Sequence, residues 1–208
     1  MHTISFYTQG TYYEADANKL RASCDRFKIS HTIVPIESLA NNSSPAKPAW
    51  SSRYSNAWLS FVARKATFIR ESLILHKRPV CWLDADCEFI QDPTLLRATR
   101  ADFAIYNFFG DPMNDSGEYH PHKLWASSGV VYFAFTPLVM RLVNEWMTQL
   151  ERASWMVDDQ ALSWAFNHFR GGKLQTLWLP RSYNRMTDKW PDVEPVINHT
   201  WHAPAPTT

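Results

Sequence analysis

Strand-like and helix-like segments alternate along the chain, and this alternation limits the fold more than any single motif. Residues 3–8, TISFYT, are β-branched and aromatic enough to predict a first strand. Apolar residues recur at helical spacing through residues 13–27, and residues 30–36 have the composition of a second strand. A strand, a helix and a strand in this order predict an α/β fold that opens with a β-α-β unit.

The same alternation continues through the rest of the chain. It predicts helices over residues 57–75, from Thr136 and from Asp158, a short helix capped by Asp92, strands at residues 80–83, 102–108, 124–135 and 171–180, and a mostly extended tail. A chain of 208 residues with 45% hydrophobic content can build one core, so we expect a single domain over residues 1–208. The polar stretch at residues 38–55 is expected to be a loop near a site.

The overall charge argues against a chain dedicated to binding polyanions, because the net charge is +1 and the pI is near 7.8. A local nucleic-acid-binding patch stays open, formed by Arg97, Arg100, Arg170, Lys173, Arg181 and Arg185. Three cysteines without metal-type spacing indicate a reducing compartment. No segment reaches the roughly 18 apolar residues of a membrane span, and the first residues do not resemble a secretion signal. We therefore expect a cytoplasmic protein with no membrane partner.

Two aspartates, Asp84 and Asp86, follow directly on the apolar strand at residues 80–83. Side chains at positions i and i+2 of a strand point to the same side, so the carboxylates can converge while Ala85 points away. Two carboxylates held close repel each other unless a cation lies beside them. Mg²⁺ or Mn²⁺ prefers such oxygen ligands and usually brings phosphate oxygens. Because open α/β sheets bind ligands beyond the carboxyl ends of their strands, a metal site with a nucleotide or phosphate ligand is predicted here.

The order of four short motifs resembles one family. A helix with a lysine, an apolar strand ending in Asp-x-Asp, the SSG of residues 127–129 and the DDQ of residues 158–160 at a helix start are similar to nucleotide-diphosphate-sugar glycosyltransferases of the GT-A type. The resemblance runs from ISFYT to VINH, nearly the whole chain. It implies a single Rossmann-like GT-A domain with a mixed central sheet flanked by helices. It also implies transfer of a sugar, dependent on Mn or Mg, from a nucleotide-diphosphate donor to an acceptor left open as glycan, protein or nucleic acid.

The resemblance also implies roles for particular residues. The metal would be bound by Asp84, Asp86 and His199, with His202 as a rival to His199. The nucleotide-sugar donor would be held by Thr8, Gln9, Tyr12, Lys65, Asp84, Ser128 and Gly129, with Arg64 as a rival to Lys65. The catalytic group would be Asp159, Asp158 and Gln160, with Asp159 favoured as the acid that faces the sugar or the acceptor. The DDQ stretch resembles retaining members of the family more than inverting ones.

Two other functions stay open. A Mg-dependent phosphatase of the haloacid dehalogenase type also places Asp-x-Asp after an apolar strand, with the first aspartate as nucleophile, although usually on the opening strand. A non-catalytic carbohydrate-binding protein would account for the ten tryptophans, which can stack on sugars. Plain structural roles are open as well: Asp158 and Asp159 can cap a helix, Lys65 can lie on a solvated helix face, and Ser128 with Gly129 can form a strand kink.

Overall fold

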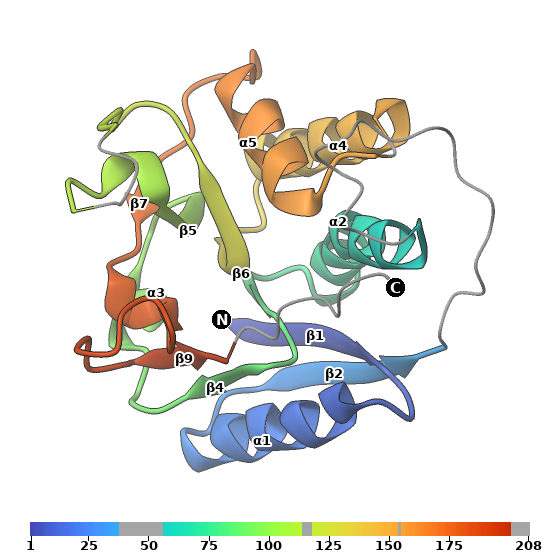
Figure 1. Cartoon of the computed structure of the whole chain (residues 1–208). Helices are drawn as coiled ribbons and strands as arrows, with labels where there is room; N and C mark the ends of the chain where they lie inside the picture. The colour runs from blue at the N-terminus through green and yellow to red at the C-terminus, as the bar shows by residue number, and fades with distance from the viewer. Residues whose placement is uncertain (38–55, 114–117, 154, 201–208) are drawn as a thin grey trace.

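A computed structural model describes residues 1–37, 56–113, 118–153 and 155–200 of the chain. The loop expected at residues 38–55 and the alternative ligand His202 lie outside these described residues. Figure 1 shows a central sheet with helices on both faces and a smaller sheet beside it. Within the described residues, no helix is both long and apolar enough to cross a membrane.

The central sheet has six strands in the order β2-β1-β3-β6-β5-β7. The strands are β1 (His2–Thr8), β2 (His31–Ile36), β3 (Val80–Leu83), β5 (Phe103–Asn107), β6 (Ala126–Phe133) and β7 (Thr176–Trp178). β1 pairs in parallel with β2 and β3, whereas β6 runs antiparallel to both β3 and β5. The sheet is therefore mixed, and the α/β fold class expected from the sequence is confirmed.

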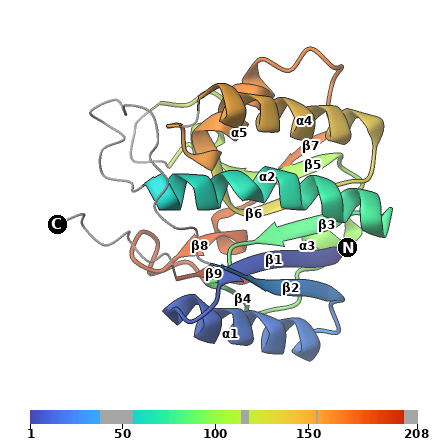
Figure 2. The same cartoon turned by 90° about the vertical axis from the view of Figure 1, so that its right-hand side faces the viewer.

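Helices cover both faces of this sheet (Figure 2). One face carries α1 (Tyr12–Arg26), and the other carries α2 (Asn56–His76), α4 (Pro137–Arg152) and α5 (Asp158–Asn167). Successive strand residues feed opposite faces, so Trp82 packs with the α2 side while Leu83 packs with the α1 side. Thr136 caps α4 as expected, since its side chain accepts a hydrogen bond from Val139 N at 3.3 Å.

A second, three-stranded sheet was not indicated by the sequence pattern. It has the order β4-β9-β8, formed by β4 (Cys87–Phe89), β9 (Ile197–His199) and β8 (Arg185–Met186). The tail was expected to be mostly extended, but its pairing was not predicted: β9 pairs antiparallel with β4 and sets His199 opposite Cys87. Strands of two or three residues are too short to show a period of two, so they escape a pattern search.

Three short helical segments complete the described chain: α3 (Thr94–Ala98), η2 (Phe108–Gly110) and η3 (Arg181–Tyr183). Asp92 was expected to cap the first of them, and this expectation was wrong. The residue at the cap position is Pro93, which makes no side-chain cap hydrogen bond, and Leu95 N in the first turn donates to Tyr183 Oη at 2.9 Å. Asp92 instead accepts a hydrogen bond from Arg97 Nε at 2.6 Å, so its carboxylate forms an ion pair along the helix.

His2 begins β1 and is held neutral in the fold. It is 4% exposed, and its ring nitrogens lie 3.2 Å from Ser30 Oγ and 2.9 Å from Thr32 Oγ1. Arg78 Nη2 lies 2.9 Å from His2 Nδ1. Burial, and after it the nearby His76 and Arg78, lower the pKa of His2 from 6.5 to about 4.

We predict that the free energy of unfolding falls by up to about 3 kcal/mol between pH 6.5 and pH 4 because of His2. Above pH 6.5 the imidazole is neutral in both states, but below it the unfolded chain binds a proton that the folded ring does not accept. Urea denaturation across this pH range should show the fall in the wild type and a shallower fall in His2→Gln. Equal slopes for the two proteins would contradict the assignment to His2.

Candidate functional site

Asp84 and Asp86 lie in a tight turn between β3 and β4, not within a strand. The turn is closed by Cys87 N, which donates to Asp84 O at 2.9 Å, and is tied to β6 by Asp84 N, which donates to Gly129 O at 2.8 Å. The two side chains therefore converge because of the turn, and the expected alternation along a strand was the wrong reason. Ala85 does not leave the site, as it lines the same pocket as the two acids.

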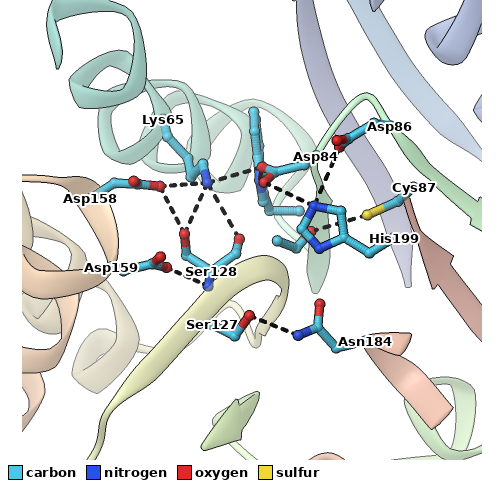
Figure 3. A network of polar contacts seen from close by, with 12 residues as sticks. Lys65, Asp84, Asp86, Cys87, Ser127, Ser128, Asp158, Asp159, Asn184 and His199 are labelled. Atoms are coloured by element: carbon cyan, nitrogen blue, oxygen red, sulfur yellow. Dashed lines mark hydrogen bonds and ion pairs between the residues drawn. The ribbon is translucent and has the colours of Figure 1, made fainter. Parts of the chain in front are cut away.

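His199 completes a group of oxygen and nitrogen donors with the two aspartates (Figure 3). Its Nε2 lies 3.4 Å from Asp86 Oδ1 and 3.8 Å from Asp84 Oδ2. Burial alone would lower the pKa of His199, but its hydrogen bond to Asp86 and the charge of Asp86 outweigh this and raise it. Separations of this size suit ligands that share one ion, and two carboxylates with an imidazole are a donor set for Mn²⁺ or Mg²⁺. The residues present thus fit a divalent metal.

Gly129 makes the position of His199 possible. A Cβ built on Gly129 would lie 2.4 Å from Cε1 and 2.6 Å from Nδ1 of the His199 ring, so no larger residue fits beside it. Nδ1 of His199 is buried and has no hydrogen-bond partner among the described residues. The ring is therefore held by packing against the glycine and by its contacts with the acids.

Cys87 lies close to the same donors but is not suited to bind the metal. The Cys87 thiol, Asp86 and His199 offer ligand atoms within 4.8 Å of one another. Burial, and after it the charge of Asp86, raise the pKa of the Cys87 thiol well above its usual range. Sγ lies 3.6 Å from Gly129 O as a weak donor, and thiolates suit softer ions than Mn²⁺ or Mg²⁺, which prefer oxygen ligands.

Lys65 lies on α2 and is 4% exposed. Its Nζ lies 2.5 Å from Asp158 Oδ2, 2.9 Å from Asp84 Oδ1 and 3.0 Å from Ser128 Oγ. Burial would lower the pKa of Lys65, but the charges of Asp158 and Asp84 outweigh it and raise the pKa above its ordinary value. The three N–H groups of the ammonium thus all face acceptors of the protein itself. Lys65 could bind a nucleotide-sugar donor only by giving up one of these acceptors.

Ser128 links the acids of α5 to this lysine. Its hydroxyl donates to Asp158 Oδ2 at 2.7 Å, and its backbone N donates to Asp159 Oδ1 at 2.6 Å. These groups are available because the β5–β6 ladder shifts register: Ile105 faces Val131, but Tyr106 faces Ser127. The bulge frees Ser128 and Gly129 from pairing with β5, which confirms the kink expected at these small residues.

Asp158 and Asp159 occupy the first turn of α5, where the helix dipole favours negative charge. Asp158 is 5% exposed and paired with Lys65, whereas Asp159 bonds only a backbone amide among the contacts found. Burial, and after it the charge of Asp158, raise the pKa of Asp159 from 3.8 to about 6. Asp159 can therefore exchange a proton near neutral pH. Gln160 does not line the pocket, and its Oε1 is buried without a partner among the described residues.

These residues surround one pocket of about 230 Å³. The polar side is formed by Lys65, Asp84, Asp86, Ser127, Ser128, Gly129, Asp158, Asp159 and His199, and the aromatic side by Phe6, Tyr7, Tyr13, Phe61 and Trp82. Almost all of the residues expected at the metal and at the sugar are thus brought together. An aromatic wall facing a wall of four carboxylates, one ammonium and one imidazole suits a ligand with a flat ring and hydroxyl groups, and it suits an anionic group only together with a cation.

Thr8, Gln9 and Tyr12 do not line the pocket, although they lie beside it at the end of β1 and the start of α1. Tyr7 and Tyr13 line it instead, and the sequence reading did not select them. A signal for Tyr13 existed, since it belongs to the apolar stripe of α1 that faces the sheet. Tyr7 is the last buried aromatic of β1, and strand alternation alone does not identify which end residue faces a cleft.

Comparison with known proteins gives the fold. No protein-family model and no curated protein matches the chain. Similar solved structures include a glycosyltransferase involved in glycosylation of the major capsid of PBCV-1, with 11% identity, coverage of 96% of this chain and 92% of that one, and a TM-score of 0.59. The galactosyltransferase LgtC, solved with donor and acceptor sugar analogs, has 13% identity, 99% and 88% coverage and a TM-score of 0.60. Mouse xyloside xylosyltransferase 1 has 14% identity, 99% and 99% coverage and a TM-score of 0.51. The fold is that of the GT-A glycosyltransferases.

We predict that Gly129→Ala destabilises the protein by about 1–3 kcal/mol and displaces the His199 ring, because the added methyl would overlap the ring. Affinity for Mn²⁺, measured by calorimetry, should fall at least tenfold. Gly10→Ala is the control: Gly10 has φ +74° but open space around it, so the variant should lose about 1 kcal/mol of stability and no metal affinity. Unchanged Mn²⁺ affinity in Gly129→Ala would contradict the role of this contact.

We also predict that Asp159→Asn stabilises the metal-free protein at pH 7.5 by about 1–3 kcal/mol. The folded state disfavours the Asp159 carboxylate, so stability that is present below pH 3.8 is lost as the pH rises through about 6. Asparagine stays neutral and can still accept from Ser128 N. Chemical denaturation should show the two proteins converging near pH 4 and separating above pH 6, and a constant difference would contradict this titration.

Proposed function

We propose that this chain is a metal-dependent glycosyltransferase that takes its sugar from a nucleotide-diphosphate donor. The observation that carries the proposal is the convergence of Asp84, Asp86 and His199 at the charged side of a pocket whose other side is aromatic. The GT-A fold supports it. LgtC, which has this fold, was solved with analogs of a donor and an acceptor sugar. The acceptor stays open as a glycan, a protein or a nucleic acid.

In this proposal Asp84, Asp86 and His199 hold Mn²⁺ or Mg²⁺. The bound ion would supply charge neutralisation for the diphosphate that leaves. Asp84 is the most open of the three, with 31% of its side chain exposed, against 6% for Asp86 and for His199. One face of the site is therefore left for the donor, as an open catalytic site requires.

The donor sugar is proposed to lie between the aspartates of the turn and those of α5. Ser128 and Gly129 approach it through backbone that the bulge frees from pairing with β5, and Asp159 lines the same pocket. An acid with a pKa of about 6 can bind a sugar hydroxyl as acceptor or hold a proton from it. Lys65 acts as a positioning residue, because it fixes Asp84 and Asp158 and has no proton left for the donor.

The aromatic wall is proposed to receive the base of the nucleotide. Tyr7, Tyr13 and Phe61 line the pocket with aromatic rings, and any of the bases can stack on such rings, because stacking does not depend on hydrogen bonds specific to one base.

The two rival functions make different demands on the residues of the pocket. A phosphatase needs Asp84 as a free nucleophile, yet Asp84 accepts from Lys65 Nζ at 2.9 Å and from Trp82 Nε1 at 2.7 Å. A plain sugar-binding module has no need of a buried acid pair.

The test is a thermal-shift measurement with UDP-, GDP- and TDP-sugars, with and without Mn²⁺, on the wild type and Asp86→Ala. A donor at 100 times its Kd should stabilise the folded protein by about 2.7 kcal/mol, and the shift should need the metal and be lost in Asp86→Ala. Asp92→Ala, which removes an acid paired with Arg97 outside the pocket, should keep the shift. A CMP-sugar is a further control, because it has a single phosphate.

Each rival has its own outcome in this experiment. Sugar binding that survives chelation of the metal would favour the carbohydrate-binding module. A phosphoaspartate trapped at Asp84 would favour the phosphatase. If no nucleotide-diphosphate sugar stabilises the wild type at any metal concentration, the glycosyltransferase proposal is wrong.

A further inference from the structure

The end of the molecule opposite the pocket has its own chemical character. Strands β1, β2 and β3 begin at this end, and helices α1, α2 and α3 finish there (Figure 2). β6 runs antiparallel to β3 and pairs Phe133 with Val80, so the connection from β6 to α4 lies at the same end. We call this surface the basal end, meaning the connections that follow α1, α2, α3 and β6.

The basal end is rich in cations. Its exposed basic residues include Lys28 after α1, Lys77 and Arg78 after α2, and Arg97 and Arg100 in and after α3. Asp25, Glu71, Asp92 and Asp102 are acids near these positions; Asp92 is paired with Arg97, and Asp102 accepts a hydrogen bond from Thr136 Oγ1 at 3.1 Å. A cation at the C-terminus of a helix complements its dipole, which explains each residue on its own. Because the three helices finish at one end of the sheet, the cations gather on a single surface.

Contacts near the start of the chain bring some of these cations close to one another. Arg78 Nη2 reaches His2 Nδ1 at 2.9 Å, which brings the connection after α2 against the first residues of β1. Arg97 donates to Phe27 O, which joins α3 to the connection after α1. Lys77 takes a positive φ of 48° directly after α2, so the chain turns sharply at this point. The cations of three connections therefore lie around the same strand ends.

Large apolar side chains are exposed on this same end. Leu75 and Ile74, in the last turn of α2, are 75% and 44% exposed, and Phe135, which follows β6, is 41% exposed. The helix dipole gives no reason for them, and they cost free energy in water. Aliphatic side chains surrounded by lysine and arginine are a pattern of surfaces that insert shallowly into lipid.

We propose that the basal end binds the surface of a membrane that contains anionic lipids. The lysines and arginines would lie at the lipid phosphates, and Leu75 and Ile74 would enter the region between headgroups and acyl chains. A nucleic acid would use the same cations but would gain little from two exposed aliphatic residues. The net charge of +1 does not oppose this, because binding depends on the charge of the contacting surface and not on that of the whole chain. The proposal does not rest on glycosyl transfer.

This orientation has a consequence for the pocket. The pocket lies at the carboxyl ends of β1 and β3, and the basal end lies at their amino ends. A chain bound through its basal end therefore turns its pocket away from the lipid and toward the aqueous phase. Its ligands would reach it from solution, and membrane binding should leave the affinity for them unchanged.

The test is co-sedimentation of the full chain with vesicles of phosphatidylcholine alone and of phosphatidylcholine with 30% phosphatidylglycerol, at about 0.1 M salt, where surface charges still interact. Binding is expected only to the anionic vesicles. Lys77→Gln should weaken it about fivefold, the effect of one cation at such a surface. Leu75→Ser should weaken it by a similar or larger factor, because it removes an inserted side chain.

Matched variants at the pocket end serve as controls. Met113→Ser removes a residue that is 73% exposed, and Lys123→Gln removes an exposed cation, and both should bind vesicles as the wild type does. Folding is checked by the melting temperature of each variant. Equal binding to neutral and anionic vesicles, or none to either, would overturn the proposal. So would weakening in Lys77→Gln with no effect in Leu75→Ser, together with binding to single-stranded DNA, since this would indicate a general polyanion surface.

Discussion

The buried ammonium of Lys65 is the interaction on which the site depends. It joins α2, the turn after β3 and the first turn of α5 through Asp84, Asp158 and the hydroxyl of Ser128. Removing charges from water costs several kcal/mol per ion, and this cost is offset only when every group is paired at short distance. The four-group network meets that condition. It also leaves the second carboxylate oxygen of Asp84 facing His199. The position of Asp84 relative to His199 therefore depends on the position of Lys65.

The strands and helices with long apolar periods could be predicted from the sequence. β1, α1, β2, α2, β3, β5, β6, α4, α5 and β7 all coincide with segments whose pattern had indicated them. The same logic placed Asp84 and Asp86 at the carboxyl end of a strand, where ligands bind in open sheets. Ser128 was assigned to the site only by the resemblance, and it reaches the aspartates from near the amino end of β6, which runs antiparallel to β3. β1, β3, β5 and β6 are almost continuously buried, so runs of apolar and β-branched residues, together with helical periods between them, are sufficient to indicate the central layer.

The remaining features depend on contacts that no local pattern records. His199 reaches the acids through β9, a strand of three residues that exists only because β4 lies beside it. From the sequence, Lys65 was as compatible with a solvated helix face as with a place in the site. Only the tertiary fold brings Asp158, which lies far along the chain, against it. Tyr13 lines the pocket in place of Tyr12 because the rotation of the first turn of α1 decides which of the two rings faces inward, and Tyr7 lines it in place of Thr8 and Gln9 at the end of β1. The direction of one side chain depends on its local contacts, whereas a sequence period is an average over many residues and does not give it.

The direction of the helices connects the two ends of the molecule. α1, α2 and α5 begin at the pocket, where their N-termini carry partial positive charge, and α1 and α2 finish at the basal end. The carboxylates of Asp158 and Asp159 lie at the positive end of α5, which offsets part of the cost of burying them. The lysines and arginines that follow α1 and α2 are stabilised by the negative ends. The cations at the ends of α1 and α2 therefore lie at one end of the molecule because the β-α-β topology runs its strands and helices in opposite directions.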